Sequence, residues 1–255
     1  MKIATDFAPP LSIVAPFFVI AGVFFVVSGI ALFGLDVGFA YNDFRVASWV
    51  HLFMLGFVMT VILGAMAQLI PVLLEKGHSF VFVFAPIPYI FAVGTIMTAY
   101  SFASNPLLLW YGGALIAVAV LLYLLDVFAT LFSAKRRSLS VVLMWGAHIF
   151  LGAAIFVGFF AALSFRYGFE VQIEQLLLSH AALGVIGFMF AIIIGVAVIL
   201  LPMFGLAHGF SQKPAEYSAW ALSLGVIWVC GVSFFDLQKA IPIGFLMIAA
   251  SIVFF

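Results

Sequence analysis

Charged residues are scarce in this sequence: Asp, Glu, Lys and Arg make up 7% of its 255 residues, whereas 67% are apolar. So few charges could not cover the surface of a soluble domain of this size, which excludes a soluble globular protein. The 9 basic and 9 acidic residues cancel. This balance offers nucleic acid no net positive charge, so nucleic acid is not an expected partner, and the lipid bilayer is.

Cysteine is also nearly absent. The single cysteine, Cys230, lies within an apolar run, so a disulfide within the chain is impossible and a cysteine-based metal site is disfavoured. The first apolar run is followed by many others. We therefore expect it to be a first membrane span rather than a cleaved signal peptide.

Long apolar runs are what the sequence has in abundance, and a helix needs about 20 residues to cross a bilayer. Short polar loops separate eight such runs. The pattern predicts an all-α, polytopic integral membrane protein. We expect its transmembrane helices over residues 12–34, 46–74, 80–103, 107–133, 140–165, 176–205, 217–235 and 240–255.

Lysine and arginine are divided unevenly between the two sets of loops. One set, which includes the N-terminus, carries six: Lys2, Lys76, Lys135, Arg136, Arg137 and Lys213. The other set carries three: Arg45, Arg166 and Lys239. Because cytoplasmic loops carry the excess of positive charge, we expect a multi-pass protein of the inner (plasma) membrane with both termini in the cytoplasm.

Glycine and proline recur in pairs at one fixed offset in the numbering, called the repeat offset below. The pairs are Gly56 and Gly187, Gly64 and Gly195, Pro71 and Pro202, Gly94 and Gly225, and Gly113 and Gly244. The offset predicts one transmembrane domain over residues 1–255 that consists of two four-helix repeats, about 1–133 and about 138–255. An even number of spans gives both repeats the same topology, which makes them parallel repeats. The last helix would then extend nine residues past Phe255, so either it is short or the chain continues.

Three histidines lie inside apolar runs, where each ring needs a partner, a ligand or an aqueous cavity. His51 and His180 lie at similar depth below the outer surface, on spans that the repeat makes equivalent, and His148 enters from the opposite side. Two imidazoles at one depth can coordinate haem iron or copper. We therefore take His51 and His180 as candidate metal ligands, and all three as candidate cofactor-binding residues. The alternative is that each ring only hydrogen-bonds a neighbouring carbonyl.

The repeat offset pairs His180 with Trp49 and His51 with Ala182, which favours an asymmetric pair of rings over a symmetric one. The remaining histidines, His78 and His208, lie in charged loops and are expected to be solvated or interfacial. Asp126 is the one acid deep in an apolar run. It could serve a proton or cation path or pair with the Lys135–Arg137 cluster at the interface, and we favour the second.

Two stretches resemble the haem-copper oxidase subunit I superfamily: "HLFMLGFVMTVILGAMAQLIPVL", which begins at His51, and "SHAALGVIGFMFAIIIGVAVILLPMFGLAH", which begins at Ser179. The likeness is greatest to short non-oxidase members such as the nitric-oxide-response membrane proteins, and covers about a third of the chain. It implies that His51 corresponds to a ligand of the low-spin haem. It also implies that His180 corresponds to the position that holds copper in true oxidases.

The departures from that family are equally informative. Many oxidases have a Pro-Glu-Val-Tyr run after the second histidine, whereas Ala181, Ala182, Leu183 and Gly184 follow it here. The span over 217–235 also has no histidine pair. An oxygen-reducing centre is therefore not expected, and the chain is not expected to be a terminal oxidase.

The resemblance thus implies a haem-b binding membrane protein that serves electron transfer, nitric-oxide handling or haem handling. A redox partner would suit such a role, and a homo-oligomer could supply ligands that this chain lacks, although the sequence itself demonstrates neither. Three alternatives stay open. One is a copper-binding protein or carrier that uses His51, His180 and Met54. The second is a structural or assembly protein without a cofactor, and the third is a transporter of small organic solutes.

Overall fold

In a computed structural model, the described residues are 7–36, 38–40, 43–133, 138–206 and 211–255, and all their regular structure is helical. Seven of these helices are long and apolar enough to cross a membrane, and the eighth is shorter. The prediction of an all-α, polytopic membrane protein is confirmed. The long helices span Leu11–Leu32, Phe44–Leu74, Val81–Ser104, Pro106–Phe132, Leu139–Tyr167, Ile173–Phe204 and Lys213–Phe234, and the short one spans Gln238–Phe254.

The chain divides into two compact units, each described below by itself. The first comprises Met1–Ala134 and Ala162–Phe169, and the second comprises Lys135–Ala161 and Glu170–Phe255. The boundary passes through helix α6 (Leu139–Tyr167), whose last residues belong to the first unit.

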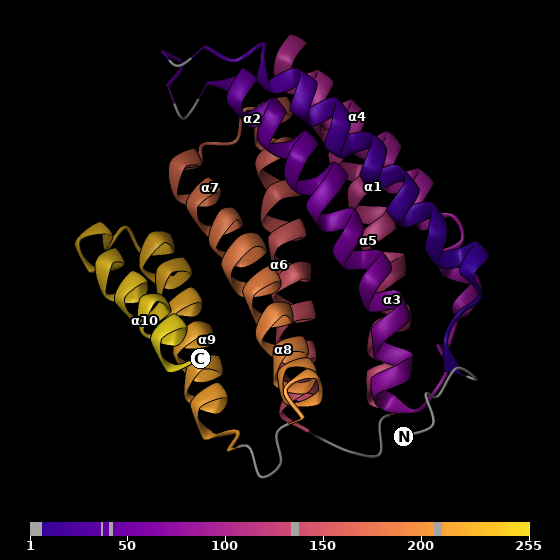
Figure 1. Cartoon of the computed structure of the whole chain (residues 1–255). Coiled ribbons are helices and arrows are strands. Elements are labelled where there is room, and N and C mark those ends of the chain that lie inside the picture. The colour runs from indigo at the N-terminus through magenta and orange to yellow at the C-terminus, as the bar shows by residue number, and fades with distance from the viewer. Residues whose placement is uncertain (1–6, 37, 41–42, 134–137, 207–210) are drawn as a thin grey trace. The chain divides into compact units, whose positions relative to one another are not determined.

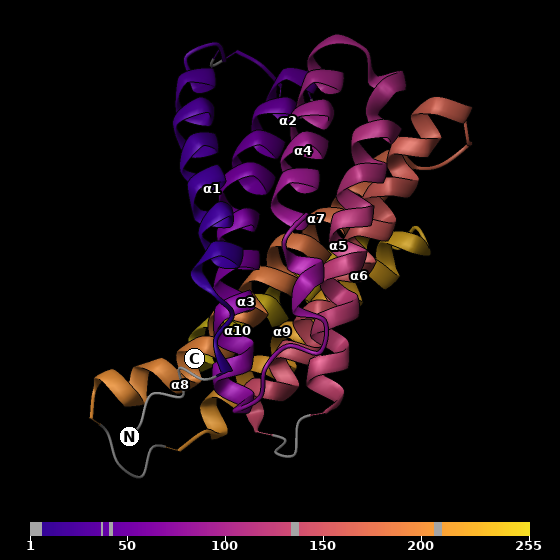
Figure 2. The ribbon, with the colours of Figure 1, turned by 90° about the vertical axis from the view of Figure 1, so that its right-hand side faces the viewer.

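The first unit contains four spans. They are α1 (Leu11–Leu32), the continuous helix of α2 (Phe44–His51), η2 (Leu52–Met59) and α3 (Thr60–Leu74), then η3 (Val81–Phe84) with α4 (Ile87–Ser104), and η4 (Pro106–Leu108) with α5 (Leu109–Phe132). Helix α1 packs along η2 and α3, and α4 packs against both α2 and α5. Figure 2 shows α1, α2 and α4 side by side.

The second unit contains α6 up to Ala161. It also contains the continuous helix of α7 (Ile173–Ala181), η5 (Ala182–Phe190) and α8 (Ala191–Phe204), then α9 (Lys213–Phe234), and η6 (Gln238–Ala240) with α10 (Ile241–Phe254). Helices α9 and α10 form a closely packed pair, which Figure 1 shows in yellow.

Glycines set the closest helix contacts in both units. A methyl group on Gly56 would overlap the Phe24 ring, and one on Gly187 would lie 2.8 Å from the Phe150 ring. Small residues let membrane helices approach this closely. The two glycines are related by the repeat offset, whereas the two phenylalanines are related by a smaller one. The second unit therefore has five more residues between ring and glycine.

The same comparison corrects one predicted pair. A methyl group on Gly244 would lie 3.0 Å from the carbonyl oxygen of Gly225, and one on Gly112 would lie 2.9 Å from that of Gly94. The packing counterpart of Gly244 is therefore Gly112 rather than Gly113. The register between the last two helices is shifted by one residue, which the sequence pattern alone did not reveal.

Each unit also contains a π-helical segment at the same place. Segment η2 ends at Met59 and η5 ends at Phe190, two positions that the repeat offset relates. In a π-helix each N–H bonds the carbonyl five residues earlier, a geometry that is rare and is often found at functional sites. The Thr60 hydroxyl follows the same spacing and donates to the Leu55 carbonyl at 2.9 Å. Segment η2 begins directly after His51.

Candidate functional site

His51 is the last residue of α2, and its half-buried ring packs on Phe102 of α4, with 4.9 Å between ring centroids. Its Nδ1 lies 2.8 Å from the carbonyl oxygen of Ala47, one helical turn earlier. Because a carbonyl only accepts, Nδ1 carries the hydrogen, and in the neutral ring Nε2 carries the lone pair. Ligating histidines are commonly oriented by such a bond to their other nitrogen.

The start of this helix is held by a local ion pair outside the membrane-spanning segment. The Arg45 guanidinium donates to the Asp43 carboxylate at 2.9 and 3.1 Å. The same carboxylate caps α2 by accepting the Arg45 backbone N–H at 2.7 Å. These bonds hold the pKa of Asp43 below its ordinary value. The cap fixes where α2 begins, and therefore the turn on which His51 lies.

His180 is held by the helix that precedes it in the chain. Its Nδ1 lies 2.9 Å from the carbonyl oxygen of Ala154 in α6. A methyl group on Gly158, one turn further along α6, would lie 2.6 Å from the ring. The imidazole therefore occupies the space that Gly158 leaves open.

The first unit contains the same bond with a different ring. Trp49 donates its Nε1–H to the carbonyl oxygen of Ser28 in α1 at 2.9 Å. The repeat offset relates Trp49 to His180. Their partners correspond as well, because Ser28 and Ala154 are as far apart in the sequence as Phe24 and Phe150. His180 thus stands where the first unit places a tryptophan, a side chain that cannot ligate a metal.

A second polar contact is also repeated. Ser48 donates its hydroxyl to the carbonyl oxygen of Ala99 at 2.8 Å. The thiol of Cys230 lies 4.0 Å from the carbonyl oxygen of Ser179. The repeat offset relates Ser48 to Ser179 and Ala99 to Cys230. The serine donates from its side chain in the first unit, whereas in the second unit it accepts with its backbone carbonyl. His51 has no such counterpart, because Ala182 takes its position in the second unit.

His148 is fully buried in the second unit. Its Nδ1 lies 2.6 Å from the Met144 carbonyl oxygen, and the Phe188 ring packs against it edge-on at 5.8 Å. The structure thus places all three candidate rings inside helices, each with Nδ1 at a backbone carbonyl. His51 lies in one unit and the other two in the second, so the prediction that His51 and His180 share a ligand stays a prediction.

We expected His78 to be solvated or interfacial; its ring is not solvated, and the pair that it forms was missed by sequence reasoning. Its side chain is 1% exposed, and its Nδ1 lies 2.5 Å from Oδ2 of Asp126, which is completely buried. Asp126 therefore pairs with a histidine of the connection after α3, whereas we expected it to pair with basic residues. That cluster, 135–137, and His208 lie outside the described residues.

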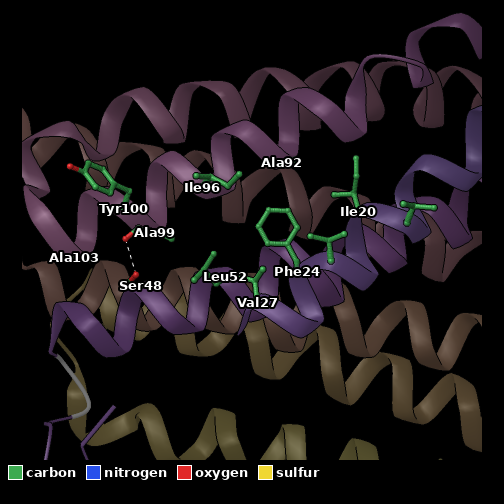
Figure 3. Close-up of a pocket in the computed structure, with 12 residues that line it drawn as sticks. Ile20, Phe24, Val27, Ser48, Leu52, Ala92, Ile96, Ala99, Tyr100 and Ala103 are labelled. Atoms are coloured by element: carbon green, nitrogen blue, oxygen red, sulfur yellow. Dashed lines mark hydrogen bonds between the residues drawn. The ribbon is translucent and has the colours of Figure 1, made fainter. Parts of the chain in front are cut away.

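A groove of about 600 Å³ runs between α1, α2 and α4. Figure 3 shows its apolar lining, with the Ser48 hydroxyl on the Ala99 carbonyl and the Tyr100 ring toward one end. The lining residues are Val19, Ile20, Val23, Phe24, Val27, Ser48, Leu52, Ala92, Ile96, Ala99, Tyr100 and Ala103. His51 does not line it, so this groove supplies no histidine ligand. It suits hydrocarbon chains.

No model of a protein family matches this chain, and no curated protein or solved structure matches it either. The resemblance to the haem-copper oxidase superfamily therefore rests on the two stretches quoted above. Among the described residues, no three His, Cys, Asp or Glu side chains gather closely enough to hold a metal ion.

Proposed function

We propose that this chain is a haem-b binding membrane protein without oxidase activity, in which His51 is an axial ligand. The observation that carries the proposal is the geometry of His51: its Nδ1–H is held by the Ala47 carbonyl at 2.8 Å, which orients the ring and makes Nε2 the nitrogen that would ligate iron. The ring also lies at the start of η2, where the second unit has Ala182 instead.

The donor chemistry fits haem better than it fits copper. Haem brings four nitrogen donors of its own and needs one or two more from the protein, which a single oriented imidazole begins to supply. A copper ion takes all its donors from the protein, and among the described residues no three His, Cys, Asp or Glu side chains gather to supply them. When bound, haem would supply an iron centre for electron transfer or for nitric-oxide binding. His51 would orient the haem, and Phe102 would cover the imidazole ring of His51.

The second axial position is assigned less directly. His180 makes the bond that Trp49 makes in the first unit, which favours a packing role for this ring. The same observation supports the alternative of a structural or assembly protein without a cofactor. His148 keeps its place as a further candidate ligand, because its Nδ1 is held by Met144 in the way that Ala47 holds His51.

The proposal also covers the membrane, the orientation of the chain and its partners. The proposed location is the plasma membrane, and the six-to-three division of Lys and Arg supports an orientation with both termini in the cytoplasm. His51 would then lie toward the outer surface. An electron-transfer role needs a redox partner at that surface, and a homo-oligomer would supply a second ligand if this chain does not.

The test is a visible spectrum of the detergent-purified protein, expressed with haem supplied, together with haem and metal analysis. We expect a Soret band and about one haem per chain. His51→Ala should lose the haem or shift the band. His180→Trp, which keeps the ring N–H, is the matched control and should retain the haem.

Two results would contradict the proposal. The first is wild-type protein that folds but never acquires haem. The second is a His51→Ala variant whose haem content and spectrum are unchanged. Stoichiometric copper without a chromophore would instead support the copper alternative. Oxygen consumption with reduced cytochrome or quinol is expected to stay at background.

A further inference from the structure

The connection between α3 and η3, residues 75–80, turns one side chain into the protein. The His78 ring is 1% exposed. Its Nε2 lies 2.7 Å from the carbonyl oxygen of Ala67, and its Nδ1 lies 2.5 Å from Oδ2 of Asp126. The ring therefore joins α3 to α5.

The Ala67 carbonyl needs this donor because of a proline. In an α-helix it would accept the backbone N–H of residue 71, but residue 71 is Pro71, which has none. A carbonyl left without a donor in the hydrocarbon region is costly, so membrane helices satisfy it from elsewhere. Here Nε2 of His78 donates the missing hydrogen bond, so Nε2 must carry a hydrogen.

The other nitrogen then requires a second proton. A neutral imidazole has one N–H, and in this ring it is committed to Ala67. A bond between Nδ1 and a carboxylate oxygen exists only if one more proton lies between them. That proton is on His78, which gives an imidazolium and a carboxylate, or on Asp126, which gives a neutral pair. In both cases the buried pair holds one proton and has no net charge.

The carboxylate also holds the backbone of the connection. Oδ1 of Asp126 accepts the Phe80 N–H at 2.5 Å, and the Thr130 hydroxyl accepts the neighbouring Ser79 N–H at 3.0 Å. The buried Phe84 ring packs on the imidazole, with 4.4 Å between centroids. Two successive amides and one ring are thus fastened to this part of the first unit.

We propose that His78 and Asp126 form a proton-dependent latch, which holds the connection between the second and third spans against α5 only while the pair keeps its shared proton. Without that proton, a lone pair of Nδ1 faces a carboxylate, or the ring turns its hydrogen to Asp126 and leaves the Ala67 carbonyl without a donor. One bond of the latch is lost either way. The latched form binds the extra proton, so raising the pH weakens it.

Few other ionisable groups lie on the elements packed around the pair. Helix α5 contributes Tyr123, which is fully buried one turn before Asp126. The connection itself contributes Glu75 and Lys76, whose side chains are exposed, and α4 contributes Tyr89, also exposed. Segment η3 contributes none. Among these groups, Asp126 and His78 are therefore the buried acid and the buried base.

Hydrogen exchange of the Ser79 and Phe80 amides in the full chain, divided by the exchange rate of an unstructured peptide at each pH, measures the latch. We expect wild-type protection to fall by up to about tenfold per pH unit where the opened form has lost this proton and the latched pair still holds it, and to level off once the latched pair releases it too. Asp126→Asn should keep the latch without the proton. Its amide N–H can donate to a neutral Nδ1, and its carbonyl can accept the Phe80 N–H.

Protection in Asp126→Asn should therefore change less than about twofold between about pH 7 and pH 9, where an exposed imidazole is mostly neutral as well. Glu75→Gln, the same substitution of carboxylate by amide on an exposed side chain of this connection, should keep the wild-type slope. Wild-type protection that does not depend on pH would overturn the proposal. So would an Asp126→Asn variant that unlatches at every pH, because the fold would then depend on the charge rather than on the proton.

Discussion

Trp49 and His180 make the same bond in two different units: each donates a ring N–H, at 2.9 Å, to a carbonyl of the helix that precedes it in the chain. Features that recur in both units hold the four-helix fold together. A feature found in only one unit, such as His51, whose counterpart is Ala182, is the better candidate for function.

The first prediction follows from this equivalence. His180→Trp should keep the bond to the Ala154 carbonyl and cost little stability, whereas His180→Ala should lose about 1–2 kcal/mol. Thermal unfolding in detergent measures the difference. Trp49→His should be tolerated for the same reason. If His180→Trp is as damaging as His180→Ala, the ring N–H is not what holds this helix pair together.

The second prediction concerns the glycine contacts. Gly56→Ala should destabilise the protein by about 1–3 kcal/mol, because the added methyl group would overlap the Phe24 ring. Gly22→Ala is the matched control. Nothing lies within 4 Å of a methyl group at Gly22, and alanine is about 1 kcal/mol better than glycine inside a helix. Equal melting temperatures for the two variants would show that the contact at Gly56 is not tight.

The same contact can be tested by compensation. Replacing Phe24 by Ala should itself be costly, since Phe24 is buried. In a Phe24→Ala background, however, Gly56→Ala should cost much less than it does in wild type, because the clashing ring is gone. Additive losses in the double variant would contradict a direct clash between these two residues.

The spans were predictable because about 20 apolar residues are needed to cross a bilayer, whatever the helix packs against. The first was expected over 12–34 and lies at Leu11–Leu32. The role of His180 was not predictable, because its partner, Ala154, lies well before it in the chain and on another helix. A sequence shows which rings lie at membrane depth. It does not show which carbonyl each ring faces.

His78 was misjudged for a related reason. Charged neighbours made its loop look solvated, and its partner Asp126 lies 48 residues later. Two signals in the sequence point the right way when they are combined. An acid inside an apolar run needs a partner, and Pro71 leaves a carbonyl without a donor four residues before it. A histidine seven residues after the proline can satisfy both.

The last prediction tests that explanation of Pro71 and His78 directly. Pro71→Ala restores a backbone N–H at residue 71, which can donate to the Ala67 carbonyl and so replace the hydrogen bond from His78 Nε2. His78→Ala in wild type removes the donor that His78 supplies to the Ala67 carbonyl and the one that it supplies to Oδ2 of Asp126. In the Pro71→Ala background it leaves only Asp126. We therefore expect His78→Ala to cost about 1–2 kcal/mol less in that background, measured as a double-mutant cycle of unfolding free energies. Asp126→Asn should show no such coupling to Pro71→Ala, since its amide does not replace the donor to Ala67. A cycle in which His78→Ala costs the same in both backgrounds would mean that the Ala67 carbonyl does not depend on His78.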